Sequence, residues 1–172
     1  FTDAVEKAGL WEEHIILNRN AFLKERSADN ARLYYVVNGC LRVFVLDDFE
    51  EQTIRFAYQD NFITLLDSFI SGKPSEYFMQ ALKKTELKVI SKKSFMELVN
   101  RSSENLQRWQ RILEQLIYQQ LERERDLLTD SPHERYRREL QRSPRLFQEV
   151  PHKYIASYLR MTPETLSRIK KT

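Results

Sequence analysis

Apolar and polar positions over residues 15–95 form short runs rich in β-branched and aromatic residues, with turn signals between them. Such runs are typical of strands. The clearest pair, Leu33–Val37 and Leu41–Val45, is separated by Asn38-Gly39 and Cys40. Asn-Gly tolerates the positive φ angles of a type I′ turn. The pattern therefore predicts a strand-rich domain that contains a β-hairpin at this dipeptide.

Three other segments complete this region. Residues 3–14 predict a short amphipathic helix before the strands. Residues 47–51 form a second polar turn between strand-like runs. Residues 62–69 are a short apolar segment that can begin a small helix, and Gly72 and Pro74 end it.

A stretch without Gly or Pro follows, from residue 94 or 103 to residue 128, and predicts a long helix. Its apolar residues form two stripes, which exceed what one contact face needs. We expect one stripe to pack on the strand-rich domain and the other on a second copy, although a single helix buried on its own domain is the alternative. The second stripe is Ile112, Ile117, Leu121 and Leu128. The first has the spacing of a coiled-coil seam, interrupted at Arg123, and supplies the predicted dimer interface: Leu106, Trp109, Leu113, Leu116 and Gln120.

Polar residues then mark the start of a separate helical domain. Ser131 is a good N-cap, Pro132 suits the first helical position, and Glu134 completes a capping box. The hinge is therefore expected at Thr129-Asp130.

Two short helices joined by a tight turn are predicted near the end of the chain. Thr162 is a good N-cap for the second, with Pro163 at its first position, and Leu166 and Ile169 face inward. A helix with a polar and basic outer face fits the DNA major groove, although an ordinary helical hairpin with a solvated face is the alternative. The candidate DNA-binding residues are Thr162, Glu164, Thr165, Ser167, Arg168, Lys170 and Lys171.

Charge strengthens this hypothesis. Residues 131–172 contain 10 Lys+Arg and 4 Asp+Glu, whereas the whole chain has a net charge of only +3. A basic end on a slightly acidic body favours a polyanionic partner. No apolar run approaches the roughly 20 residues that cross a bilayer, and no signal peptide is visible. We therefore expect a cytoplasmic protein with no membrane contact.

Composition argues against several kinds of cofactor and enzyme. One cysteine, Cys40, makes neither an internal disulfide nor an iron–sulfur site. Three glycines form no phosphate-binding loop, and neither a His-x-x-x-His metal motif nor a nucleophile elbow occurs. The histidines His14, His133 and His152 are expected to be solvated rather than haem ligands. We expect no enzyme, no metal and no cofactor.

Residues 155–169 closely resemble the helix-turn-helix of the Crp/Fnr family of bacterial transcription regulators. The Glu-Thr-x-x-Arg core of the family's recognition helix is present as Glu164, Thr165 and Arg168. The resemblance implies that Glu164 and Arg168 read base edges. In the catabolite activator an arginine precedes the glutamate, and here Pro163 occupies that position, so we expect a different operator sequence.

The resemblance covers the whole chain and implies an α+β fold. Residues 1–100 would be a cyclic-nucleotide-binding-like β-roll, a double-stranded β-helix or jelly roll. Residues 101–128 would be the dimerisation helix, and residues 129–172 a winged helix-turn-helix domain that continues beyond Thr172. The implied partners are a second copy, a near-palindromic double-stranded DNA operator and RNA polymerase.

The family's phosphate-binding cassette is similar to residues 61–81 but lacks its functional groups here. Thr64 and Leu65 occupy the positions of a Gly-Glu pair whose glutamate binds the ribose, and Ser75 and Glu76 those of an Arg-Ser pair whose arginine binds the cyclic phosphate. A buried phosphate without its cation is costly, and a carboxylate adds repulsion. We expect neither cAMP nor cGMP to bind in the usual way.

Two alternatives stay open at this point. The first is a regulator gated by an unknown small molecule in the β-roll. The second is a sensor or scaffold dimer that has lost DNA binding.

Overall fold

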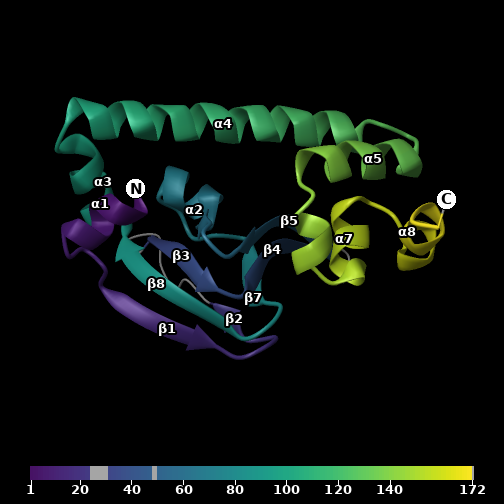
Figure 1. The fold of residues 1–172 in the computed structure, drawn as a ribbon, viewed down its shortest axis with the longest axis horizontal. Coiled ribbons are helices and arrows are strands. Elements are labelled where there is room, and N and C mark those ends of the chain that lie inside the picture. Colours follow the sequence, from purple (N-terminus) through teal and green to yellow (C-terminus); the bar gives the residue numbers. More distant parts are fainter. Residues whose placement is uncertain (24–30, 48–49, 172) are drawn as a thin grey trace.

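The computed structural model describes residues 1–23, 31–47 and 50–171. A β-roll of two antiparallel sheets forms the body, a long helix lies along it, and a group of short helices follows at one end (Figure 1). One sheet has the order β1-β8-β3-β6 and the other β2-β7-β4-β5. The strands are β1 (Glu13–Leu17), β2 (Phe22–Leu23), β3 (Arg32–Asn38), β4 (Cys40–Asp47), β5 (Glu50–Tyr58), β6 (Phe62–Ile63), β7 (Phe78–Ala81) and β8 (Thr85–Ser91).

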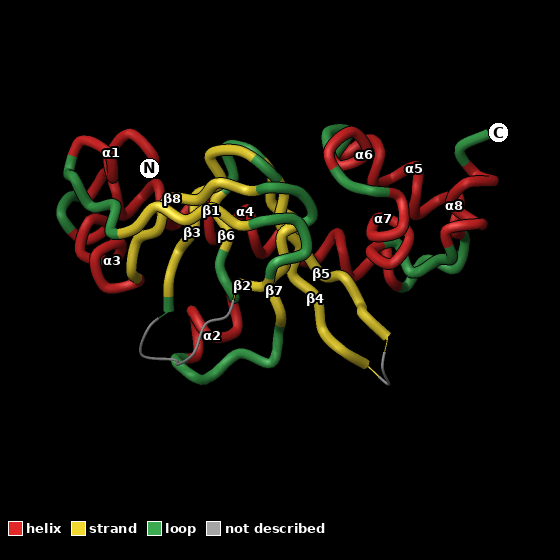
Figure 2. Tube along the Cα trace, turned by 90° about the horizontal axis from the view of Figure 1, so that it is seen from below, coloured by secondary structure: helices red, strands yellow, loops and turns green. Residues whose placement is uncertain are grey.

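The helices lie at both ends of the roll and beside it (Figure 2). α4 runs past α2 and the sheets, and α7 lies next to β4 and β5 (Figures 1 and 2). The helices are α1 (Thr2–Lys7), α2 (Leu66–Ser71), α3 (Lys92–Asn100), α4 (Ser103–Leu127), α5 (Pro132–Arg142), α6 (Leu146–Glu149), α7 (His152–Tyr158) and α8 (Pro163–Ile169). No helix in the described part of the chain has the length and apolar character to span a membrane.

The predicted hairpin at Asn38-Gly39 is wrong, although both of its strands exist. β3 pairs with β6 and β8, whereas β4 pairs with β5 and β7, so the chain crosses between sheets at this point. Within this dipeptide only Gly39 has a positive φ, of 111°, whereas a type I′ turn needs two consecutive residues with a positive φ. A Cβ at Gly39 would lie 2.4 Å from Thr85 Oγ1, so glycine is needed here for the close crossing of two strands.

Helix boundaries follow local signals where caps are present. Ser102 Oγ accepts a hydrogen bond from Asn105 N at 3.1 Å, which starts α4 at the later of the two predicted positions. Ser131 caps α5 through Glu134 N, as predicted. The predicted helix over residues 3–14 ends earlier, at Lys7, because Gly9 adopts a φ of 62° and the chain then enters β1.

Three apolar clusters organise the molecule. The first fills the space between the two sheets and includes Leu65, and the second lies at the end of the roll under α1, α3 and Trp109. The third joins Cys40 and Leu82 of the roll to the C-terminal helices through Leu146, Val150, Ile155, Ala156, Leu159 and Leu166. The C-terminal helices are therefore packed directly on the β-roll.

Candidate nucleic-acid interface and sensor cassette

α7 and α8 form the predicted pair of helices. Ile155, Leu159 and Leu166 are fully buried between them and the rest of the domain. The turn passes through Arg160, whose φ of 53° lies in the left-handed region. Met161 N then donates to Ala156 O at 3.0 Å and closes the turn. No strand occurs within residues 129–171, so the wing stays a prediction.

The start of α8 is capped by a threonine pair. Thr162 Oγ1 accepts from Thr165 N at 3.2 Å and lies 3.1 Å from Thr165 Oγ1, and Pro163 occupies the first turn. The predicted N-cap is confirmed. Both threonine side chains, which the sequence suggests as DNA contacts, thus bind each other, and Thr162 also binds the helix end.

Removing this cap should destabilise the domain. We expect Thr162→Ala to lower the free energy of unfolding by about 1 kcal/mol, because one amide of the first turn loses its acceptor. Urea unfolding followed by circular dichroism measures it. Ser167→Ala on the exposed side of the same helix is the control and should change stability by less than about 0.5 kcal/mol. Equal effects of the two changes would contradict the capping role.

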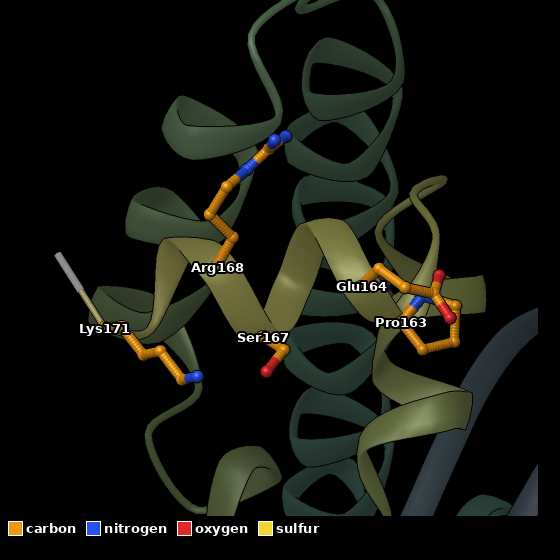
Figure 3. Close-up of a pocket in the computed structure, with 5 residues that line it drawn as sticks. All are labelled: Pro163, Glu164, Ser167, Arg168 and Lys171. Atoms are coloured by element: carbon orange, nitrogen blue, oxygen red, sulfur yellow. The ribbon is translucent and has the colours of Figure 1, made fainter.

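The outer side of α8 presents four of the candidate side chains. Glu164, Ser167, Arg168 and Lys171 are exposed and, with Pro163, line a shallow hollow on this helix (Figure 3).

The remaining candidate, Lys170, points to the start of α7, where its Nζ lies 2.5 Å from His152 Nε2. The structure therefore brings Glu164, Ser167, Arg168 and Lys171 together on one surface and gives Thr162, Thr165 and Lys170 other neighbours.

The residues of the predicted dimer seam on α4 do not all face the same way, and some of them contact the rest of the chain. Trp109 packs edge-on against Phe95 of the same chain, with ring centroids 5.4 Å apart. Gln120 Oε1 accepts from Arg55 Nη2 at 3.5 Å. Leu113 and Leu116 are half-buried.

The side chains that α4 exposes lie mainly on the other stripe. Their exposed fractions are 51% for Leu106, 62% for Ile117, 57% for Leu121 and 78% for Leu128. From the predicted interface, Leu106 remains outward, whereas Trp109 and Gln120 are engaged with the β-roll. The exposed apolar face of α4 is therefore centred on Ile117 and Leu121; together with Leu106 and Leu128 these residues form the outer stripe.

The cassette segment, β6 to β7, begins with two buried residues. Thr64 Oγ1 donates to Arg32 O at 2.7 Å. Leu65 is 3% exposed and belongs to the apolar cluster between the sheets. Where the family places a ribose-binding carboxylate, this chain has a core side chain.

In the second half of the cassette, Ser75 and Glu76 form hydrogen bonds with Asp67 of the same segment. Ser75 Oγ lies 2.8 Å from both carboxylate oxygens of Asp67, and Glu76 N donates to Asp67 Oδ2 at 3.2 Å. The sequence contains no arginine between Arg55 and Arg101. The side chain of Asp67 thus binds groups of its own segment, and the segment lacks the arginine that the family resemblance places opposite the cyclic phosphate.

Comparison with known proteins identifies the β-roll. A family model described as "Cyclic nucleotide-binding domain" matches residues 17–102, which is half of the chain. The chain belongs to the cyclic nucleotide-binding domain family. No curated protein sequence matches it.

Several solved structures share the fold of this family member over nearly its whole length. FixK2 from Bradyrhizobium japonicum has a TM-score of 0.77 at 16% identity and covers 92% of this chain and 82% of its own. The catabolite activator protein of Thermus thermophilus has a TM-score of 0.59 at 18% identity, covering 99% and 82%. CLP of Xanthomonas campestris, a c-di-GMP-responsive global regulator, has a TM-score of 0.67 at 15% identity, covering 99% and 90%. The predicted likeness to Crp/Fnr regulators is confirmed for the fold.

Two arginines that sequence reasoning did not assign hold the helix pair of this family member in place. Arg135 Nε donates to Leu159 O at 2.8 Å and its Nη2 to Arg160 O at 3.0 Å, both in the turn. Its Nη1 donates to Asp130 O at 3.0 Å and to Thr129 O, in the hinge. The sequence shows Arg135 only as one more basic residue of a basic helix.

Arg123 is the second of these arginines. Its Nη2 donates to Tyr158 O, and its guanidinium lies 3.8 Å from the centre of the Tyr158 ring. The interruption of the apolar seam at Arg123 was the visible signal in the sequence, and the structure explains it by a contact with α7.

A buried ionic network fixes α5 against α4. Asp126 is fully buried and accepts from Arg138 Nε at 2.6 Å and Arg142 Nη2 at 2.5 Å. Glu139 is also buried and pairs with Arg142, and loss of water raises the pKa of the Glu139 carboxyl. Such a network keeps the C-terminal helices at a defined position relative to the long helix.

Proposed function

We propose that the protein is a sequence-specific DNA-binding transcription regulator of the Crp/Fnr type that acts without a cyclic nucleotide. The observation that carries this proposal is the exposed face of α8, where Glu164, Ser167, Arg168 and Lys171 lie opposite the buried Leu166. An arginine can pair with guanine through two hydrogen bonds, and a glutamate accepts from the cytosine amine. Lysine and serine contact phosphates, which position the helix without reading sequence.

The proposed domains are a β-roll over residues 1–100, a dimerisation helix over 101–128 and a winged helix-turn-helix domain over 129–172. The proposed partners are double-stranded DNA, RNA polymerase and a second copy of the chain. The second copy packs along the outer stripe of α4, where apolar side chains are exposed on a 25-residue helix. Two-fold symmetry then presents both α8 helices to one side of the DNA.

Selection from a library of random duplexes tests the proposal. We expect the full-length protein to enrich a near-palindromic sequence with half-sites about 34 Å apart, because each copy reads one major groove. Enrichment of no sequence, with no more than a weak attraction to any duplex that disappears at physiological salt, would leave a sensor or scaffold dimer as the better interpretation.

The proposal also predicts the response to cyclic nucleotides. We expect 1 mM cAMP or cGMP to leave the melting temperature unchanged, since Leu65 fills the core and Ser75 binds Asp67. A ligand at 100 times its Kd adds about 2.7 kcal/mol to stability, an effect that differential scanning fluorimetry detects easily. A shift with either nucleotide would contradict our interpretation of Leu65 and Ser75. A shift with c-di-GMP, to which the similar protein CLP responds, would favour the effector-gated alternative.

A further inference from the structure

The outer face of the β2-β7-β4-β5 sheet carries a buried arginine. Along β4, Leu41 and Val43 enter the apolar cluster between the sheets, so Arg42 lies on the opposite side. Its side chain is only 2% exposed. Its Nε and Nη2 donate to Gln80 Oε1 at 3.0 and 2.7 Å, and Nη2 also pairs with Glu51. A buried guanidinium held this way is fixed in position.

This arginine contacts the first helix of the candidate DNA-binding pair. Its guanidinium lies 4.1 Å from the centre of the Phe44 ring in β4 and 4.3 Å from the centre of the Tyr154 ring in α7. A cation between two aromatic rings is attracted to both, and more strongly when water is excluded. The sensor domain therefore holds α7 through Tyr154.

A second polar contact lies one turn further along α7. The register of β4 and β5 shifts between Val43 and Phe44, and next to this bulge Thr53 N donates to Ser157 Oγ at 3.0 Å. Ser157 Oγ in turn lies 2.9 Å from Glu51 O. A bulge changes the direction of backbone groups that would otherwise pair within the sheet. Here the amide of Thr53 donates to Ser157 of the neighbouring helix α7.

The area around these contacts is apolar and continuous. Cys40 and Leu82 of the roll share one buried cluster with Ile155 and Leu159 of the helix pair. At the edge of the cluster, Lys83 Nζ pairs with Glu149 Oε2 at 2.9 Å.

We propose that Arg42 and Ser157 are positioning residues for the recognition helix: together they fasten α7 to β4 and β5 and so set the orientation of α8 without an effector. This inference rests on the proposed function and assigns the regulation of its DNA-binding face. α7 and α8 have seven residues each, so their orientation depends on what they pack against. The contacts join an arginine side chain and main-chain groups of a sheet to α7, so both partners of each contact belong to this chain.

Cys40 offers a readout that needs no DNA. It is the chain's one cysteine, is fully buried, and lies in the cluster that joins the roll to the C-terminal helices. Burial also raises the pKa of its thiol to about 12, so it is protonated and unreactive at pH 8 while the helices stay docked. Its reaction with a thiol reagent therefore reports undocking of α7.

The test compares Tyr154→Leu with Tyr154→Phe in the full chain. Tyr154→Leu removes the ring that faces Arg42, whereas Tyr154→Phe keeps it and serves as the matched control. We expect Cys40 to react with Ellman's reagent about 10-fold faster in Tyr154→Leu than in the wild type, and at the wild-type rate in Tyr154→Phe. Affinity for the selected operator should fall about 10-fold in Tyr154→Leu, with affinity for a scrambled duplex unchanged.

Ser157→Ala is the second variant. The urea midpoint of each variant separates undocking of α7 from a loss of stability of the whole protein. We expect Ser157→Ala to raise Cys40 reactivity and to lower the overall stability less than Tyr154→Leu does. Wild-type Cys40 reactivity and wild-type operator affinity in both Tyr154→Leu and Ser157→Ala would overturn the inference. If the wild type selects no DNA sequence, the proposed function fails, and Cys40 reactivity still decides whether these residues hold the domains together.

Discussion

Arg168→Ala is expected to lower affinity for the selected operator by about 1–3 kcal/mol and affinity for a scrambled duplex very little. This corresponds to about 5- to 150-fold in Kd. The reason is that a guanidinium paired with guanine is lost only from the complex with the correct sequence. Fluorescence anisotropy with both duplexes at one fixed salt concentration measures the two affinities.

Lys171→Ala on the same face is the matched control. A phosphate contact contributes equally on every sequence, so we expect it to weaken both complexes by the same factor and to reduce the slope of affinity against salt. If Arg168→Ala behaved in this same way, Arg168 would be a phosphate contact and Glu164 would be the remaining candidate for base reading.

The double substitution Ile117→Glu with Leu121→Glu is expected to convert the protein into a monomer. Each apolar side chain buried in an interface contributes about 1.5–3 kcal/mol. A dimer that loses four of them, two from each copy, would lose about 6 kcal/mol or more before charge repulsion is added. Analytical ultracentrifugation measures the mass, and binding to the palindromic operator should fall to that of a half-site.

Tyr118→Glu provides the control for this experiment. Tyr118 is 64% exposed on α4 and borders the outer stripe, about 100° around the helix from Ile117 and about 60° from Leu121, so Tyr118→Glu should weaken the dimer much less than the double substitution does. A dimer that survives the double substitution would contradict a contact along the outer stripe. A dimer lost equally in Tyr118→Glu would place the contact on a different side of α4.

The strands of the β-roll could be predicted from the sequence, but their pairing could not. The runs at Leu33–Val37 and Leu41–Val45 mark β3 and β4 because alternation is a local property. The same Asn-Gly signal permits a tight hairpin or a crossing between sheets. What decides is the approach of Thr85, 45 residues beyond Cys40, to the position where Gly39 has no side chain.

Helix starts were predicted well because a cap is also local. Ser131 and Thr162 both accept the expected backbone hydrogen bonds. The direction of each face of α4 was harder to predict, because both stripes are apolar. The packing of Trp109 on Phe95 and the hydrogen bond between Arg55 and Gln120 show which side meets the β-roll.

The part of the candidate site that depends on local sequence could be predicted, and the part that depends on distant contacts could not. Exposure of Glu164 and Arg168 follows from helical periodicity and the buried Leu166. The arginines that position the helix pair, Arg42 and Arg135, act across more than 20 residues of chain. Nothing in their immediate sequence distinguishes them from solvated arginines.

One titration tests the central claim most directly: the wild-type protein on the selected palindromic duplex and on a scrambled duplex of equal length, at one salt concentration, without and then with cAMP. We predict binding at least about 10³-fold tighter to the palindrome, and no change on adding cAMP. Equal affinity for the two duplexes would contradict sequence-specific recognition by α8. Specific binding that appears only with cAMP would contradict a regulator that acts without a cyclic nucleotide.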